Sequence, residues 1–131
     1  MKKTTIILVI LIVFVLIVGI YFVVKGRRNN DEQLLASVQN STIFFYGDGC
    51  PHCANVDKFV TDNNVESKIQ FERKEIFNDS NNSHLMTLIA TKKCGLSESN
   101  LGVPFLWDGP ESKCVSGDQP IIDFFKQKLG I

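Results

Sequence analysis

Residues 42–53 of the chain, TIFFYGDGCPHC, decide the fold. The first five are β-branched or aromatic and are followed directly by Gly47, a pattern that predicts a buried central strand. Pro51 favours the first position of a helix, because its missing N–H is not needed there and its fixed φ is already helical. Cys50 and Cys53 are therefore expected at the junction between a buried strand and a helix.

The remaining sequence continues the alternation of strands and helices. Strands are predicted at residues 69–76, 105–107 and 113–116, and helices from Pro51 to a stop at 63–64, at 84–94 and at 121–129. Residues 78–83 are polar and predict a loop, and an Asp108-Gly109-Pro110 turn joins the last two strands in a hairpin. The order β-α-β-α-β-β-α predicts an α/β fold with a central mixed sheet of about four strands and helices on both faces.

The C-x-x-C segment carries what thiol–disulfide exchange needs. Cys50 at the helix start would face the free N–H groups of the first turn, and the helix dipole favours its thiolate. A protonated His52 would add to this effect, and such surroundings lower a cysteine pKa from ~8.5 to between ~3.5 and ~7.5. Cys53, one turn deeper, is expected to resolve the mixed disulfide before the substrate leaves.

This segment resembles the active-site turn of the thioredoxin superfamily. The resemblance covers roughly residues 40–131, and it rests on the strand 44–46, the glycine-rich approach 47–49 and the CPHC sequence at 50–53. The inner Pro51-His52 pair is similar to that of DsbA-type oxidases, as is Val103 ahead of Pro104. The likeness implies a thioredoxin-like fold, no bound cofactor, and a cis Pro104 that faces the cysteines and presents the Val103 backbone to an extended substrate.

Two features depart from the family pattern. Only 50 residues separate Cys53 from Pro104, which leaves no room for the helical insertion of DsbA-type proteins and indicates a compact thioredoxin or glutaredoxin body. Phe44 stands where thioredoxins carry a buried acid, and no other carboxylate is obviously placed to relay protons to Cys53. Tyr46, just before the turn, is expected either to line the substrate cleft or to join the core.

The other two cysteines, Cys94 and Cys114, are isolated in the sequence. With Cys50, His52 and Cys53 they would suffice for a zinc site, but zinc sites usually pair two close knuckles, and the strand-turn-helix context favours a redox pair. Binding or delivery of copper or zinc through Cys50 and Cys53 stays as the alternative function. Cys94 and Cys114 are expected to form a structural disulfide or, alternatively, a second redox pair.

The amino-terminal segment predicts a membrane anchor. Residues 4–24 carry no charge, and at about 1.5 Å per residue a helix of this length spans the ~30 Å hydrocarbon core. A cleavable signal peptide is the alternative, but its apolar stretch is shorter, about 7 to 15 residues, and residues 19–22 offer no small-residue cleavage site. Basic residues flank the segment on both sides, so charge does not decide its orientation.

Three segments are therefore expected: an anchor at residues 1–24, a juxtamembrane linker with a short helix at 25–39, and a thioredoxin-like domain at 40–131. An even number of cysteines beside an anchor favours an oxidising compartment. The domain is accordingly expected on the extracytoplasmic side of the cell membrane.

The net charge of residues 31–131 limits the classes of partner that the domain can bind. Residues 31–131 hold nine Lys or Arg against fourteen Asp or Glu, so the basic surface that nucleic-acid binding requires is missing. The expected partners are protein thiols or disulfides, an unidentified redox protein that recharges the cysteines, and the membrane through residues 4–24. The Pro51-His52 pair favours an oxidase or isomerase over a reductase, and nothing in the sequence indicates a dimer.

Overall fold

The computed structural model describes residues 2–131, and the chain from Leu35 onward forms a compact α/β unit. Its strands are β1 (Thr42–Tyr46), β2 (Glu72–Glu75), β3 (Phe105–Asp108) and β4 (Lys113–Ser116). Its helices are α2 (Pro51–Asp62), α3 (Ser80–Leu88) and α4 (Asp118–Leu129), with short 3-10 turns η1 (Val65–Ser67) and η3 (Glu98–Asn100). A π-helical turn, η2 (Ile89–Lys93), continues α3. The elements follow one another in the predicted order.

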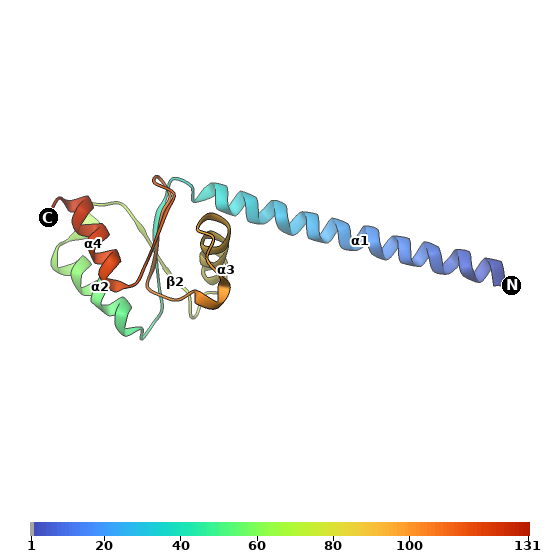
Figure 1. The fold of residues 1–131 in the computed structure, drawn as a ribbon, viewed down its shortest axis with the longest axis horizontal. Helices are drawn as coiled ribbons and strands as arrows, with labels where there is room; N and C mark the ends of the chain where they lie inside the picture. Colours follow the sequence, from blue (N-terminus) through green and yellow to red (C-terminus); the bar gives the residue numbers. More distant parts are fainter. Residues whose placement is uncertain (1) are drawn as a thin grey trace. The chain divides into compact units, whose positions relative to one another are not determined.

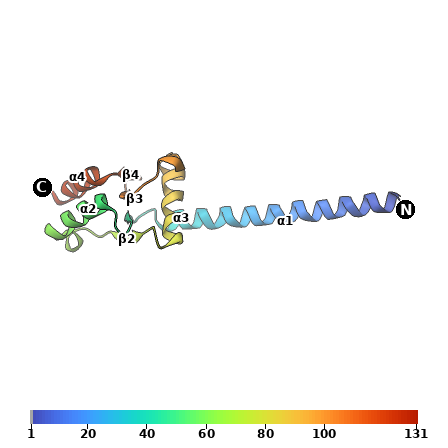
Figure 2. The same ribbon diagram turned by 90° about the horizontal axis from the view of Figure 1, so that it is seen from below.

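The sheet is mixed, with the strand order β2-β1-β3-β4. Strand β1 runs parallel to β2, with Tyr46 opposite Glu75, and antiparallel to β3, with Phe45 opposite Phe105. Strand β4 closes the hairpin beside β3. Helices α2 and α4 cover one face of the sheet and α3 covers the other (Figures 1 and 2). The predicted layered sheet is therefore confirmed.

Buried apolar side chains fill the space on both faces of the sheet. The cluster beneath α2 and α4 consists of Phe44, Val56, Val60, Val65, Leu106, Val115, Ile121, Phe124 and Phe125. On the other side of β1, the ring of Phe45 packs against Phe105 with centroids 6.1 Å apart. Because β1 is covered on both faces, its sequence is continuously apolar instead of alternating.

Three elements of the domain differ from the sequence prediction, the simplest case being α4, which begins at Asp118 and not at residue 121. Residues 80–83, predicted as a loop, form the first turn of α3, because the Asp79 side chain accepts hydrogen bonds from the N–H groups of Asn81 and Asn82 at 2.9 and 3.1 Å. Asparagine and serine are common both in loops and at helix starts, so composition alone did not separate the two. Strand β2 is also shorter than the predicted 69–76.

Residues 2–34 belong to a separate unit and lie within helix α1 (Lys2–Ser37). By length and composition α1 can cross a membrane. The linker that was predicted, with a short helix, at residues 25–39 is not a separate segment, because residues 25–33 are helical and continue α1 without a break to Ser37. The physical reason is that nucleation is the costly step of helix formation, so polar residues are added to an existing long helix at little expense.

Candidate functional site

Cys50 and Cys53 lie at the start of α2, directly after β1 and its glycine turn. Cys50 is the N-cap residue, with φ −76° and ψ 115°, and Pro51 occupies the first turn of the helix. The two cysteines form a disulfide with their Cα atoms 5.2 Å apart. Cys53 is only 2% exposed, whereas Cys50 is half-buried. An incoming thiol therefore reaches the sulfur of Cys50 more easily than that of Cys53.

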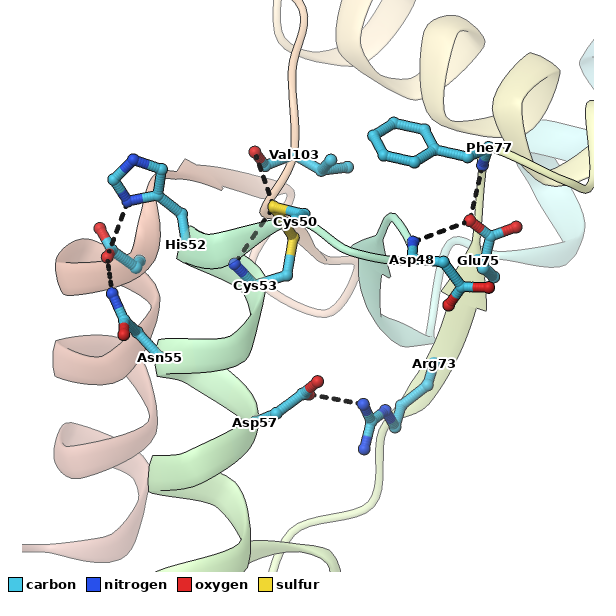
Figure 3. The surroundings of a disulfide bond; sticks show 11 residues. Asp48, Cys50, His52, Cys53, Asn55, Asp57, Arg73, Glu75, Phe77 and Val103 are labelled. Atoms are coloured by element: carbon cyan, nitrogen blue, oxygen red, sulfur yellow. Dashed lines mark hydrogen bonds and ion pairs between the residues drawn. A yellow bond between two sulfur atoms is a disulfide. The ribbon is translucent and has the colours of Figure 1, made fainter.

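The sulfur of Cys50 lies between the helix terminus and the loop before β3 (Figure 3). The backbone N–H of Cys53 donates a hydrogen bond to Cys50 Sγ at 3.2 Å, and the carbonyl oxygen of Val103 lies 3.8 Å from the same atom. The Val103–Pro104 peptide bond is cis. Free N–H groups and the positive end of the helix dipole favour negative charge on this sulfur once the disulfide is open.

His52 points away from the core and is held by α4. Its side chain is 71% exposed, and its Nδ1 atom lies 3.0 Å from Oδ2 of Asp118. Asn55 donates a hydrogen bond of 2.7 Å to the same oxygen. These hydrogen bonds from Asn55 and then His52, against some desolvation, lower the pKa of Asp118 to about 2. A full negative charge therefore lies beside the imidazole at neutral pH.

Glu75, at the end of β2, fixes the turn that leads to Cys50. Its carboxylate accepts hydrogen bonds from the N–H groups of Phe77 and Asn78, both at 2.7 Å, and from that of Asp48 at 3.2 Å. Burial alone would raise the pKa of Glu75, but these N–H groups, together with that of Asp79, outweigh it and lower the pKa. The turn before α2 and the segment before α3 are thus both hydrogen-bonded to the same carboxylate.

A carboxylate also lies one helical turn beyond Cys53. Asp57 is four residues further along α2, on the same helix face, and it forms an ion pair with Arg73 of β2 (Figure 3). Burial raises the pKa of Asp57, although Arg73 acts in the opposite direction, and Glu66 raises it further. A carboxyl with a raised pKa exchanges protons closer to neutral pH. This carboxylate was not predicted from the sequence, although its four-residue spacing from Cys53 was a usable signal.

Tyr46 lies at the edge of the core beneath α2. Its ring stacks on Phe44 with centroids 6.1 Å apart, and the Arg73 guanidinium lies 5.2 Å from the ring centroid. Tyr46 therefore packs against the hydrophobic cluster of this face. Its role in substrate binding stays a prediction.

Cys94 and Cys114 pair with each other, their Cα atoms 6.2 Å apart. Cys94 follows η2 and Cys114 belongs to β4, and both line an open cavity of about 510 Å³ together with Leu96. Within residues 2–131, no three His, Cys, Asp or Glu side chains are grouped so as to hold a metal ion. The four cysteines thus form two separate pairs and not one four-ligand zinc site.

The hydrogen-bond partners around His52, Asp118 and Asn55, were not predicted from the sequence either. Asn55 follows His52 by three residues on one helix, so its proximity was predictable from helical spacing. Asp118 is 66 residues away from His52 in the sequence, and only the packing of α4 beside α2 brings the two together. No local pattern indicates such a contact.

Wheat glutaredoxin is a solved structure similar to this chain. The match has a TM-score of 0.50 and a sequence identity of 22%, and it covers 74% of this chain and 84% of the wheat protein. No protein-family model and no curated protein matches the sequence. The structural likeness confirms the thioredoxin-like fold that the CPHC segment predicted.

Proposed function

We propose that this protein is a membrane-anchored thiol–disulfide oxidoreductase that exchanges disulfides with protein substrates through Cys50 and Cys53. The observation that carries the proposal is the half-exposed Cys50 at the N-cap of α2, paired with the buried Cys53. The thioredoxin-like fold supports thiol–disulfide exchange in general. One sulfur accessible to a partner and a second held behind it are what the reaction needs.

In the oxidising direction, a substrate thiolate attacks Cys50 Sγ and breaks the Cys50–Cys53 bond. Cys53 leaves as a thiolate and takes up a proton, and the substrate is held as a mixed disulfide on Cys50. A second substrate thiolate attacks the substrate sulfur of that mixed disulfide and releases Cys50, whose thiolate is stabilised by the N–H groups of α2. The substrate loses two electrons and two protons, and the reduced cysteine pair carries the electrons.

The residues around Cys50 have distinct proposed roles. Val103 and Pro104 position an extended substrate segment beside the sulfur, since the Val103 carbonyl lies 3.8 Å from it. His52, when protonated, stabilises the Cys50 thiolate, and Tyr46 supports the cleft from the core side. We favour oxidation or isomerisation over reduction, because stabilising the thiolate makes the disulfide form more oxidising.

We further propose that α1 anchors the protein in the cell membrane, with the folded domain on the extracytoplasmic side. The length and apolar composition of the helix support the anchor. The pairing of Cys94 with Cys114 supports an oxidising compartment, because the cytoplasm keeps protein thiols reduced and structural disulfides are rare there.

Trapping of the mixed disulfide tests the proposed reaction. In the full-length Cys53→Ser variant, Cys50 can still form a mixed disulfide with a substrate. The complex persists because the variant has no Cys53 thiol to attack it. We expect covalent, dithiothreitol-sensitive complexes with membrane or extracytoplasmic proteins on non-reducing gels. The matched Cys50→Ser variant keeps one thiol of the pair but is expected to form none, because Cys53 is buried. Equal trapping by both variants would contradict the assignment of Cys50.

The reduction potential of the Cys50–Cys53 pair tests the direction. The full-length protein is equilibrated in glutathione buffers, with the Cys94–Cys114 pair followed separately by mass spectrometry. We expect a value close to the ~−120 mV of DsbA, as for a disulfide donor. A value near the ~−270 mV of thioredoxin would instead make the protein a membrane-tethered reductant.

A further inference from the structure

An aromatic side chain stands exposed beside the reaction centre. Phe77 follows β2 and is 61% exposed, compared with 38% for Leu96 on another loop. Single exposed apolar side chains are common on protein surfaces, but this one borders a reactive disulfide, and aromatic side chains are enriched in the cores of protein–protein interfaces. The question is therefore what covers Phe77.

The ring of Phe77 lies on the turn that leads to Cys50. A Cβ atom added to Gly47 would collide with the carbons of this ring, so the ring rests directly on the Gly47 backbone. The N–H of Cys50 in turn donates a hydrogen bond to the Gly47 carbonyl at 3.2 Å. In Figure 3 the Phe77 side chain points from its loop toward Val103. The ring thus borders the approach to Cys50.

The backbone that carries Phe77 is firmly held. Glu75 accepts hydrogen bonds of 2.7 Å from the N–H groups of both Phe77 and Asn78. Asn78 also donates through its side chain to Asp48, at 3.2 Å. An aromatic group held in place before binding loses little conformational freedom when a partner covers it.

The charges around the ring indicate the kind of partner. Residues 46–50 and 75–79 contain three carboxylates, Asp48, Glu75 and Asp79, and no Lys or Arg. The nearby Arg73 and Lys74 form ion pairs with Asp57 and Glu72, which offset their charges. Such a surface repels a small anionic thiol such as glutathione. An extended protein segment brings backbone groups for Val103 and an apolar side chain for Phe77, so it suits this surface better.

We propose that Phe77 determines substrate specificity by binding an apolar side chain next to the reacting cysteine of a protein substrate. The proposal rests on the thiol–disulfide exchange proposed above and names its substrate class: extended segments in which a cysteine is flanked by a large apolar residue. The exchange itself takes place at Cys50, and Phe77 contributes contact area only.

The test uses the full-length oxidised protein in lipid nanodiscs and two synthetic dithiol peptides. The peptides are identical except for Phe or Ser next to the first cysteine. The rate of reduction of the Cys50–Cys53 disulfide is followed by acid quenching and mass spectrometry. One well-placed apolar contact changes such a rate by about tenfold or more, so we expect the wild-type protein to prefer the Phe peptide by about this ratio.

Variants separate binding by Phe77 from a general effect on the site. Phe77→Ser is expected to bring the ratio of the two rates close to one. Phe77→Trp keeps a large aromatic side chain at this position, so it is expected to keep a ratio close to the wild-type value. Leu96→Ser removes an exposed apolar side chain elsewhere and is expected to leave the ratio at the wild-type value. Reporting a ratio cancels any change in the intrinsic reactivity of Cys50.

The outcomes distinguish this inference from the proposed function. A wild-type protein that reacts with both peptides at equal rates, or a preference that persists in Phe77→Ser, overturns the role of Phe77 and leaves the oxidoreductase intact. A wild-type protein that exchanges with neither peptide nor with glutathione overturns both. A strong rate with glutathione and weak rates with both peptides overturns the assignment to protein substrates.

Discussion

A single carboxylate, that of Asp118, holds two side chains of α2. His52 Nδ1 and Asn55 Nδ2 both meet its Oδ2 atom, at 3.0 and 2.7 Å. Hydrogen bonds from Asn55 and His52 lower its pKa from the ordinary 3.8 to about 2. A pKa that is lower in the folded state means that folding favours the charged form. Asp118 therefore contributes stability above a pH of about 4, and this contribution is lost as the pH falls toward 2.

We expect Asp118→Asn to lower the free energy of unfolding at neutral pH and to flatten its decline between pH 4 and 2. The amide still accepts hydrogen bonds, so the variant removes mainly the charge and its titration. Urea unfolding of the full-length protein in detergent micelles can be followed through Trp107, the single tryptophan, which is 1% exposed.

Asp123→Asn is the matched control, since it changes a carboxylate of the same helix α4 that contacts Gln119 and Lys126 and not His52. A decline between pH 4 and 2 that is as steep in Asp118→Asn as in the wild-type protein would contradict the assignment of the low pKa.

For individual residues, local sequence patterns were enough to predict where the cysteines lie but not which side chains surround them. Cys50, Pro51 and Cys53 stand at a strand-helix junction that four consecutive residues define, so their placement follows from the sequence. The contact of His52 with Asp118 depends on how α4 packs against α2, which no short-range spacing records. Asp57 is intermediate, because its four-residue distance from Cys53 was visible but its partner Arg73 was not.

At the scale of elements, Glu75 joins the ends of several segments. It closes β2, its carboxylate binds N–H groups of the turn before α2 and of the approach to α3, and its carbonyl accepts a 2.9 Å hydrogen bond from the Asn82 side chain. These N–H groups lie in exposed turns outside any regular helix or strand pairing, and one side chain accepts hydrogen bonds from all three of them. The position of Phe77 and the entry into α2 therefore depend on the same group.

We expect Glu75→Ala to increase amide hydrogen exchange at Asp48, Phe77 and Asn78, because these N–H groups lose their acceptor. The measurement is hydrogen exchange on the full-length protein, read by mass spectrometry of peptides from residues 46–50 and 75–80. Glu72→Ala, three residues earlier on the same strand, serves as the control, since Glu72 pairs with Lys74 and not with the turn. Unchanged exchange in both peptides would show that other contacts hold the turn.

Element boundaries were harder to predict than element order. The apolar run of β1 and the proline at the start of α2 were unambiguous, and both elements have the expected bounds. The start of α3 was missed, because Asp79 acts as a cap only once the following polar residues are helical. The continuation of α1 through residues 25–33 was missed for a related reason: propagation from a long helix outweighs the weak preferences of a polar segment.

At the scale of the whole molecule, the second disulfide links the α3 layer to the sheet itself. Cys94 closes the α3–η2 layer and Cys114 lies in the edge strand β4, so their bond ties one face of the sheet to its edge across a separation of 20 residues. In the loop-entropy account, a loop of this length contributes roughly 3 kcal/mol to stability. A domain that depends on this bond is suited to an oxidising compartment.

The oxidation state of Cys94 and Cys114 in cells therefore reports where α1 places the domain. If the domain lies outside the cytoplasm, as proposed, we expect Cys94 and Cys114 of the full-length chain to be joined in a disulfide. After acid quenching and unfolding, neither cysteine should then be alkylated by maleimide–polyethylene glycol. A matched chain that lacks residues 2–24 stays in the cytoplasm, and its Cys94 and Cys114 should react. Both chains carry Cys50→Ser and Cys53→Ser, so that only the second pair is read. Reactive thiols in the anchored chain would place the domain in the cytoplasm, where an oxidase role and a structural disulfide are both untenable.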